Sequence, residues 1–181
     1  MKKVIFPIFV ILLAVSHLNA QWPSNETTNE SKANDSVIVS GDLANGALME
    51  DLSWAANSSN ACFPATQNLK FRGNHVLYAT SIPPRSILTI SVTPTDANGD
   101  LSIYGYMMGN KEYRVVPNLP SCISCEADHK WDGKWKGKVQ TSERKIEFQN
   151  PTKNTYNIVI GVSAPKDITT GKFNLKLKLK S

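Results

Sequence analysis

Apolar and polar residues alternate at every second position in several short runs of this 181-residue chain, and the last run is the clearest. Residues 173–180 read FNLKLKLK, so that Phe173, Leu175, Leu177 and Leu179 are separated by Asn or Lys. Successive side chains of a β-strand point to opposite faces of its sheet. The run therefore predicts a strand with one buried face and one lysine-bearing face toward water.

The stretch 82–106 contains two such runs on either side of a polar tip. The first alternates Leu, Ile and Val with Thr and Ser as far as Pro94, and the second begins at Leu101. Between them, Asn98-Gly99 supplies residues that suit a tight turn. Two period-2 runs around a short turn predict an antiparallel hairpin with one buried face.

Further short strands are expected where β-branched and aromatic residues cluster between Gly, Pro and Asn turn signals. They cover residues 37–39, 76–79, 113–116, 146–148 and 156–162. In residues 44–56, Leu48, Leu52 and Ala56 recur every four residues and predict a short helix, with Trp54 packing at the domain edge. The predicted fold is all-β, an antiparallel β-sandwich of jelly-roll-like kind with a short N-terminal helical segment.

The chain is expected to consist of a signal peptide, a linker and one domain. Residues 1–20 have the pattern of a signal peptide, because two lysines precede a continuous apolar run and Ala20 offers a small residue for cleavage. Residues 21–36 are almost wholly polar and are expected to form a disordered linker. Residues 37–181 then form the sandwich domain. No later segment has the roughly 20 apolar residues of a transmembrane helix, so we expect a secreted or periplasmic protein.

Charge is distributed unevenly along the chain. The formal net charge is +5, from 20 Lys and Arg against 15 Asp and Glu. Residues 129–181 alone carry twelve Lys and Arg against four Asp and Glu. This asymmetry favours affinity for anionic surfaces or polymers, with solubility as the alternative explanation.

Three stretches of the second half follow a recognisable order. Asp100 immediately precedes the run Leu101–Tyr104, residues 156–162 read YNIVIGV, and Gly171–Phe173 begins the last strand. In this pattern residues 69–180 resemble the bacterial pre-peptidase C-terminal (PPC) domain family, although Phe173 replaces the tyrosine usual in that family. The resemblance implies a β-sandwich accessory module of the kind attached to secreted hydrolases, sometimes binding calcium or insoluble substrates. Here the module is expected to stand alone, because the chain leaves no room for a protease domain.

The three cysteines are Cys62, Cys122 and Cys125. In an exported protein they predict one disulfide and one remaining thiol. We favour Cys62–Cys125, which would close a loop of about sixty residues and stabilise the fold by roughly 4 kcal/mol. Cys62–Cys122 is a close alternative and Cys122–Cys125 a third. The three cysteines with His129 would also suit zinc, but only one Cys-x-x-Cys pair is present and oxidation competes with metal binding.

Asp96, Asn98 and Asp100 stand at alternate positions of the polar tip, as oxygen ligands of calcium often do. An EF-hand is excluded, because its sixth and twelfth positions would be Leu101 and Met107. A looser calcium site remains as one interpretation, and turn chemistry alone is the other. No other cofactor is expected.

Two tryptophans lie among four lysines in residues 130–138, which read KWDGKWKGK. The six are Trp131, Trp135, Lys130, Lys134, Lys136 and Lys138. Aromatic rings beside cations stack on sugars and hold anionic polymers, so this Trp/Lys loop is the predicted binding surface. The alternative is that the tryptophans cover the sandwich edge while the lysines discourage edge-to-edge pairing.

No catalytic constellation stands out in the sequence. After the signal peptide the histidines are His75 and His129, and neither a G-x-S-x-G nor an H-E-x-x-H motif is present. We therefore predict a secreted, non-catalytic binding module for an extracellular polysaccharide or protein polymer. The alternative is a structural or accessory module that stabilises or partners a secreted hydrolase. Nucleic acid is not an expected partner of an exported protein.

Overall fold

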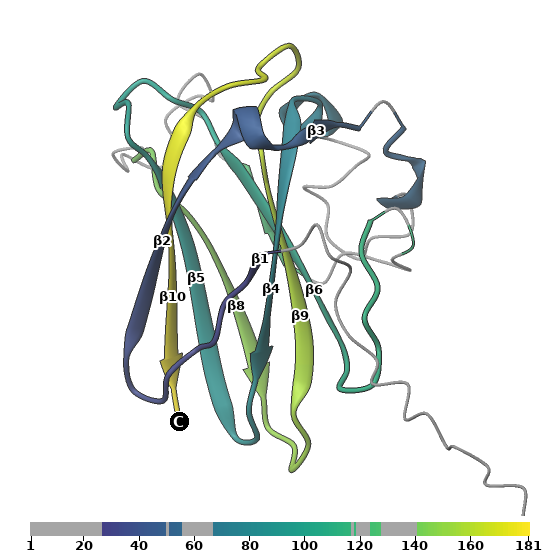
Figure 1. Ribbon diagram of the computed structural model, residues 1–181, viewed down its shortest axis with the longest axis vertical. Helices are drawn as coiled ribbons and strands as arrows, with labels where there is room; N and C mark the ends of the chain where they lie inside the picture. Colours follow the sequence, from purple (N-terminus) through teal and green to yellow (C-terminus); the bar gives the residue numbers. More distant parts are fainter. Residues whose placement is uncertain (1–26, 50, 56–66, 117, 119–123, 128–140) are drawn as a thin grey trace, which may run out of the picture.

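The computed structural model describes residues 27–49, 51–55, 67–116, 118, 124–127 and 141–181, which form two packed β-sheets (Figure 1). Its strands are β1 Thr27–Thr28, β2 Ser36–Asp42, β3 Ala47–Leu48, β4 Asn74–Ile82, β5 Ser86–Pro94, β6 Ser102–Gly109, β7 Ser124–Glu126, β8 Arg144–Asn150, β9 Tyr156–Ser163 and β10 Lys172–Lys180. One sheet has four strands in the order β2-β10-β5-β8. The other has six, in the order β1-β4-β9-β6-β7 with β3 also paired to β4. The predicted all-β sandwich is confirmed.

The core between the sheets is built from the alternating strands that the sequence predicts. β10 lies between β2 and β5, and its apolar residues from Phe173 to Leu179 are all buried while the residues between them are exposed. Leu88, Ile90 and Val92 of β5 and the inward side chains of β9 complete this core. Burial of alternate side chains on one face of each strand therefore fixes the strand register, as expected from the period of two.

The predicted hairpin over residues 82–106 is wrong. β5 pairs with β10 and β8 in the four-stranded sheet, whereas β6 pairs with β9 and β7 in the six-stranded sheet. The polar tip between them carries the chain from one sheet to the other (Figure 1). A period-2 pattern states that a strand has a buried face, but it does not state which strand lies beside it.

The outer face of the six-stranded sheet is covered by a second apolar layer. It contains Leu52, Ala55, Phe71, Tyr104, Tyr106, Val116, Ala127 and Val159. Tyr104 lies close over the sheet, because a Cβ added at Gly161 would be 2.0 Å from its ring. β6 is consequently buried on both faces over most of its length.

The predicted helix over residues 44–56 is also wrong. Its described part consists of two 3-10 turns, Leu43–Asn45 and Ser53–Ala55, with the short strand β3 between them. A Cβ at Gly46 would lie 2.3 Å from the carbonyl oxygen of His75, so the chain approaches β4 too closely here for a helix. Leu48 is 51% exposed, so it does not share a buried face with Leu52.

The expected strand over residues 113–116 does not form either. The chain turns after β6, where the Glu112 N–H donates to the Gly109 carbonyl over 2.9 Å. Val116 then packs into the second apolar layer. Its β-branched side chain is therefore buried by tertiary packing rather than by strand pairing.

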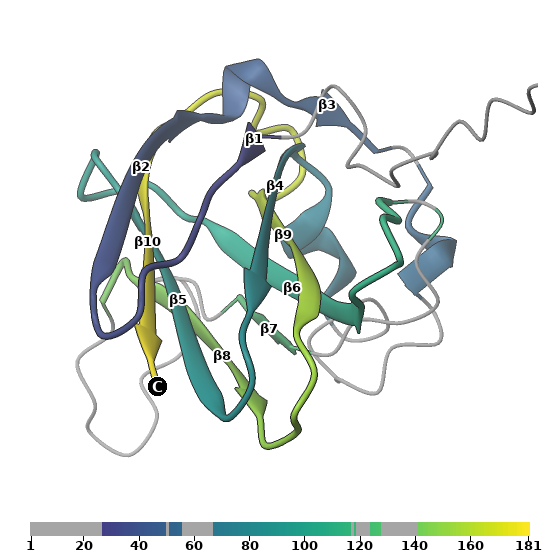
Figure 2. The same cartoon turned by 60° about the horizontal axis from the view of Figure 1, so that its bottom comes forward.

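Residues 29–35, which we call the strap, cross from β4 to β10 over one open side of the sandwich (Figure 2). The Asn29 N–H donates to the Ala79 carbonyl over 2.9 Å, and the Ser31 hydroxyl donates to the Ser81 carbonyl over 3.0 Å. Ala33 then forms a parallel bridge with Leu179. The described part of the predicted linker thus lies against both sheets. Over the residues that the structure describes, no helix has the length and apolar character to cross a membrane.

Candidate functional site

Several sequence-predicted site residues lie outside the described residues. They are Trp131, Trp135, Lys130, Lys134, Lys136 and Lys138 of the Trp/Lys loop, together with Cys62, Cys122 and His129. Cys125 is described; it lies in β7 opposite Tyr104 of β6. The predicted Trp/Lys surface, disulfide and alternative zinc site therefore stay predictions.

The polar tip at 95–101 uses its first carboxylate to form the turn. The Asp96 carboxylate accepts a hydrogen bond from the Asn98 N–H over 2.9 Å, and the Asp96 carbonyl accepts one from the Gly99 N–H over 2.9 Å. The part of the chain that is described contains no group of three or more His, Cys, Asp or Glu suited to a metal ion. Calcium binding at Asp96, Asn98 and Asp100 stays a prediction. The hydrogen bonds within the turn account for the positions of Asp96 and Asn98 without a metal ion.

His75 is a structural residue of the second apolar layer. Its side chain is 3% exposed. Nε2 lies 2.7 Å from the Phe71 carbonyl oxygen and therefore donates, whereas Nδ1 accepts from the Tyr104 hydroxyl 2.9 Å away. Burial lowers the pKa of His75 to about 4, so the ring is neutral at pH 7. With both ring nitrogens hydrogen-bonded to protein groups and the side chain almost fully buried, His75 has a structural role in the fold.

The exposed face of the four-stranded sheet gathers five lysines, and we call it the lysine face. They are Lys145 of β8 and Lys172, Lys176, Lys178 and Lys180 of β10, all exposed. Strand register places them together: Lys176 is opposite Ser91 of β5, which in turn is opposite Lys145. The sequence predicted the outward direction of the β10 lysines, but the place of Lys145 follows from strand order.

The side chains between these lysines are mostly small and neutral, with the carboxylates of Asp42 and Glu147 also on this face. Ser36, Ser40, Thr89, Ser91, Thr93 and Asn174 lie on the same face, with Ile38 among them. Ile38 is 63% exposed and is paired with Lys176 across the strands. With Ile87 opposite Lys180, the surface thus combines five lysines, two carboxylates, hydrogen-bonding groups and two apolar side chains.

Ion pairing does not neutralise the lysine face. In the described ranges the one ion pair is Arg114–Glu112, which lies elsewhere. On the face itself, Glu147 accepts from the Thr89 hydroxyl at 3.4 Å. Asp42, opposite Lys172, accepts from the N–H groups of Ala44 and Gly171, which lower the pKa of its carboxyl.

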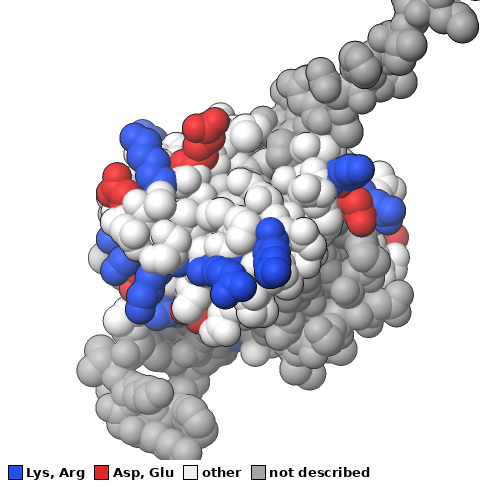
Figure 3. Space-filling view, turned by 90° about the horizontal axis from the view of Figure 1, so that it is seen from below, with Lys and Arg blue, Asp and Glu red and all other residues white. Residues whose placement is uncertain are grey.

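The lower end of the domain, where β10 ends, carries charges of both signs. Figure 3 shows Lys and Arg at several separate places there, with Asp and Glu among them. Charges of both signs that are interspersed in this way produce a weak net field.

Comparison with known proteins assigns no family to this chain. No protein-family model matches the sequence, and no curated protein matches it. Three solved structures are similar in fold. The periplasmic inhibitor of g-type lysozyme PliG from Aeromonas hydrophila has a TM-score of 0.44 and 8% identity, covering 84% of this chain and 96% of that chain.

The pre-peptidase C-terminal domain of a collagenase from Bacillus anthracis has a TM-score of 0.38 and 11% identity, covering 86% of this chain and 96% of that chain. CorA, a surface-associated copper-binding protein from Methylomicrobium album BG8, has a TM-score of 0.46 and 13% identity, covering 84% and 98%. At these identities and TM-scores the similarities assign neither a family nor a ligand. The resemblance to the PPC family stays a prediction.

Proposed function

We propose that the protein is an exported, non-catalytic binding module whose lysine face holds anionic polymers such as acidic polysaccharides. The observation that carries this proposal is the set of five exposed lysines on one sheet face, none of them in an ion pair in the described structure. Exposed ammonium groups attract anions, and they lose little solvation when they bind at a surface.

The arrangement of the lysines suits an extended ligand. Alternate residues of a strand are about 7 Å apart, so the row from Lys172 to Lys180 spans about 27 Å. A single small anion would contact one or two of these groups, whereas a polymer with repeated charges contacts the whole row. The neighbouring Ser and Thr hydroxyls can donate to and accept from sugar hydroxyls. The predicted Trp/Lys loop is a second proposed contact for the same class of ligand.

The proposal is tested by binding of the mature chain, residues 21–181, to alginate as a carboxylated polymer and to heparin as a sulfated one. The test variant replaces Lys145, Lys176, Lys178 and Lys180 by Ser. The control variant removes the same charge elsewhere, by replacing the exposed Lys32, Lys111, Lys153 and Lys166 by Ser. The two variants each lose four positive charges and so have equal net charge. A difference between them therefore reports the position of the lysines and not their number.

The test variant should bind at least one polymer about thirty-fold more weakly than the parent protein, from four contacts of roughly 0.5 kcal/mol each. The control variant should lose much less, and binding by the parent should weaken as salt rises. Equal losses of affinity in both variants would show that binding depends on net charge and not on the lysine face, which would contradict the proposal. Absence of binding to either polymer would contradict the proposal.

A further inference from the structure

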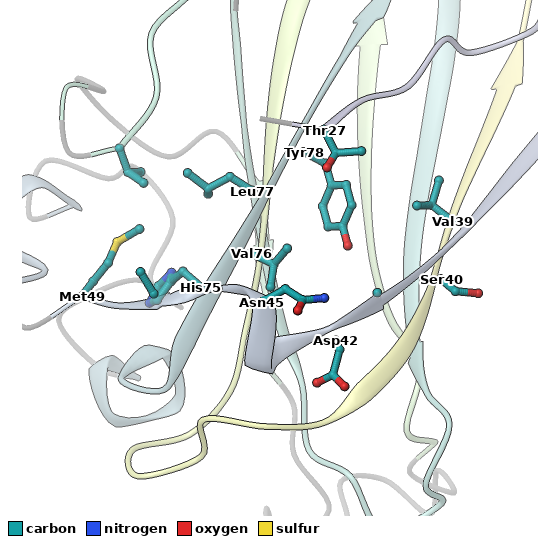
Figure 4. A pocket seen from close by; sticks show the side chains of 14 residues that line it. Thr27, Val39, Ser40, Asp42, Asn45, Met49, His75, Val76, Leu77 and Tyr78 are labelled. Atoms are coloured by element: carbon teal, nitrogen blue, oxygen red, sulfur yellow. The ribbon is translucent and has the colours of Figure 1, made fainter. Parts of the chain in front are cut away.

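A slot of about 490 Å³ opens between β2 and β4 on the side of the sandwich that the strap crosses (Figure 4). One wall is β2 from Val39 to Asp42, and the other is β4 from His75 to Tyr78. Residues from both faces of each strand line it, so the slot meets the two strands at their backbone edges. Its volume lies in the range of ordinary ligand sites, roughly 300–1,000 Å³.

Two strand edges are unpartnered at this slot. Among the residues that are described, β2 pairs only with β10, so its other edge is free over seven residues. β4 pairs with β9 along one edge; on its other edge the short strand β3 pairs with residues 74–75 and β1 with residues 78–79, which leaves that edge of Val76 and Leu77 without a described strand partner. Free strand edges present N–H and C=O groups in the spacing of another extended chain.

Polar side chains also point into the slot. Figure 4 shows the Tyr78 hydroxyl and the Asn45 amide directed into the space between β4 and β2, whereas Ser40 points away. Tyr78 is 3% exposed, and its hydroxyl has no hydrogen-bond partner within the described structure. The hydroxyl borders the slot and is not sealed inside the core, so a ligand in the slot can reach it. Burial raises the pKa of Tyr78, so the hydroxyl stays protonated and can donate.

Glycine keeps the slot open. A Cβ at Gly41 would lie 2.3 Å from the Tyr78 hydroxyl oxygen and 2.5 Å from the Phe173 ring. Any larger residue here would occupy the space in front of the hydroxyl. The sequence of β2, SVIVSGD, therefore combines a β-branched edge strand with a gap at its upper end.

The chain itself shows what closes this side of the sandwich lower down. The strap bonds there to β4 through the Asn29 N–H and the Ser31 hydroxyl and bridges to β10 through Ala33, and the chain then turns at Asn34, whose φ is +55°. The slot is the continuation of the same opening above the strap. A peptide segment that bonds to strands of both sheets thus already fits the lower half of the opening.

We infer that the slot binds a short extended segment of a partner protein, added to the edge of β2 as a further strand. The four slot residues of β2 span about 13 Å, which sets the bound length at three to four residues. Main-chain groups of the segment pair with β2, and one of its Ser, Thr, Asn or Gln side chains bonds the Tyr78 hydroxyl. A β-branched side chain enters beside Val39 and Val76. This site is separate from the lysine face and does not depend on polymer binding.

The test uses the mature chain and a panel of acetylated eight-residue peptides that alternate valine with serine or threonine and end in one lysine for solubility. Affinity is measured at low and high salt, and amide hydrogen exchange locates the bound peptide. The test variant is Tyr78→Phe, which removes only the hydroxyl. The matched control is Tyr156→Phe, a half-buried tyrosine of β9 outside the slot.

We expect saturable binding that is insensitive to salt, with slower exchange at the amides of β2 and at Val76–Leu77. Tyr78→Phe should weaken binding about ten-fold, the effect of one hydrogen bond of about 1.4 kcal/mol, and Tyr156→Phe should not change it. The lysine-to-serine variant of the polymer test should bind the peptides normally, so the two sites fail independently. The inference is overturned if no peptide binds at 1 mM, if Tyr78→Phe binds as tightly as the parent, or if neutral chitotriose binds in preference to every peptide.

Discussion

The two sheets of the sandwich differ in how many of their faces are buried. The four-stranded sheet has one buried face and one solvent-exposed face, and successive side chains of β10 alternate between them without exception. The six-stranded sheet is buried on both faces over β9 and most of β6, because the second apolar layer covers its outer side there. β9 accordingly has buried residues at every position after Tyr156.

The covered and the exposed sheet faces are therefore expected to have different roles. A sheet face that is covered by Tyr104, Tyr106 and Phe71 contributes stability and holds His75 away from solvent. A sheet face that is exposed and carries unpaired lysines is free to contact a ligand. Substitutions on the covered face should therefore change folding, whereas those on the lysine face should change binding.

The largest expected contrast is between neighbouring residues of β10. Leu175 is fully buried between Val39 and Val92, so Leu175→Ala should lower the free energy of unfolding by about 4 kcal/mol. Lys176→Ala, one residue on, should change it by about 0.5 kcal/mol or less. Denaturant unfolding measures both values, and similar losses from the two substitutions would refute a one-sided strand.

The second contrast lies between two glycines of the six-stranded sheet. Gly161→Ala should destabilise by about 3 kcal/mol, because its Cβ would lie 2.0 Å from the Tyr104 ring. Gly109→Ala is the control, since its nearest neighbour would be the Glu112 side chain at 3.5 Å. Thermal unfolding of both variants tests the close packing of the second layer, and an unchanged melting temperature in Gly161→Ala would argue against it.

The third contrast concerns pH and rests on His75. Its pKa falls from 6.5 in the unfolded chain to about 4 in the folded protein, so the unfolded state binds more protons between these values. The contribution of His75 to stability is therefore fully present above pH 6.5 and is lost as pH falls toward 4. From pH 7 to pH 5 the loss should be about 2 kcal/mol.

His75→Gln provides the comparison for this effect, because it removes the titrating ring. The variant should be less stable at pH 7 but should lose less additional stability on acidification than the parent. Urea unfolding at several pH values measures the difference between the two slopes. Identical slopes would mean that His75 titrates normally in the folded state.

The sequence predicts the four-stranded sheet better than the six-stranded one, for the same physical reason. One-sided strands such as β5 and β10 carry the period of two, and the outward direction of Lys176, Lys178 and Lys180 follows from it. β6 is buried on both faces over most of its length, and the period of two in residues 82–106 does not encode which strand lies beside it, so the sequence does not separate β6 from β5. The false helix at 44–56 arose because local spacing does not reveal the close approach of Gly46 to β4.

The candidate sites show the same limit. Lys145 joins the β10 lysines only through the strand order β10-β5-β8, which local pattern does not encode. Tyr78 and Asn45 meet in the slot because β4 and the 3-10 turn after β2 lie side by side. The position of the Tyr78 hydroxyl at the slot is a property of tertiary packing and leaves no signal in the sequence.

The most direct test of the account is an NMR titration of the ¹⁵N-labelled mature chain with alginate oligomers. If the lysine face binds the polymer, the shift changes will cluster on β10 and β8, around Lys145, Lys176 and Lys178, and will diminish at high salt. Amides of β6 and β9 beneath the second apolar layer should stay unchanged. Shift changes centred on the six-stranded sheet, or confined to Trp131 and Trp135 with none on β10, would contradict the central claim that the exposed face of the four-stranded sheet is the binding surface.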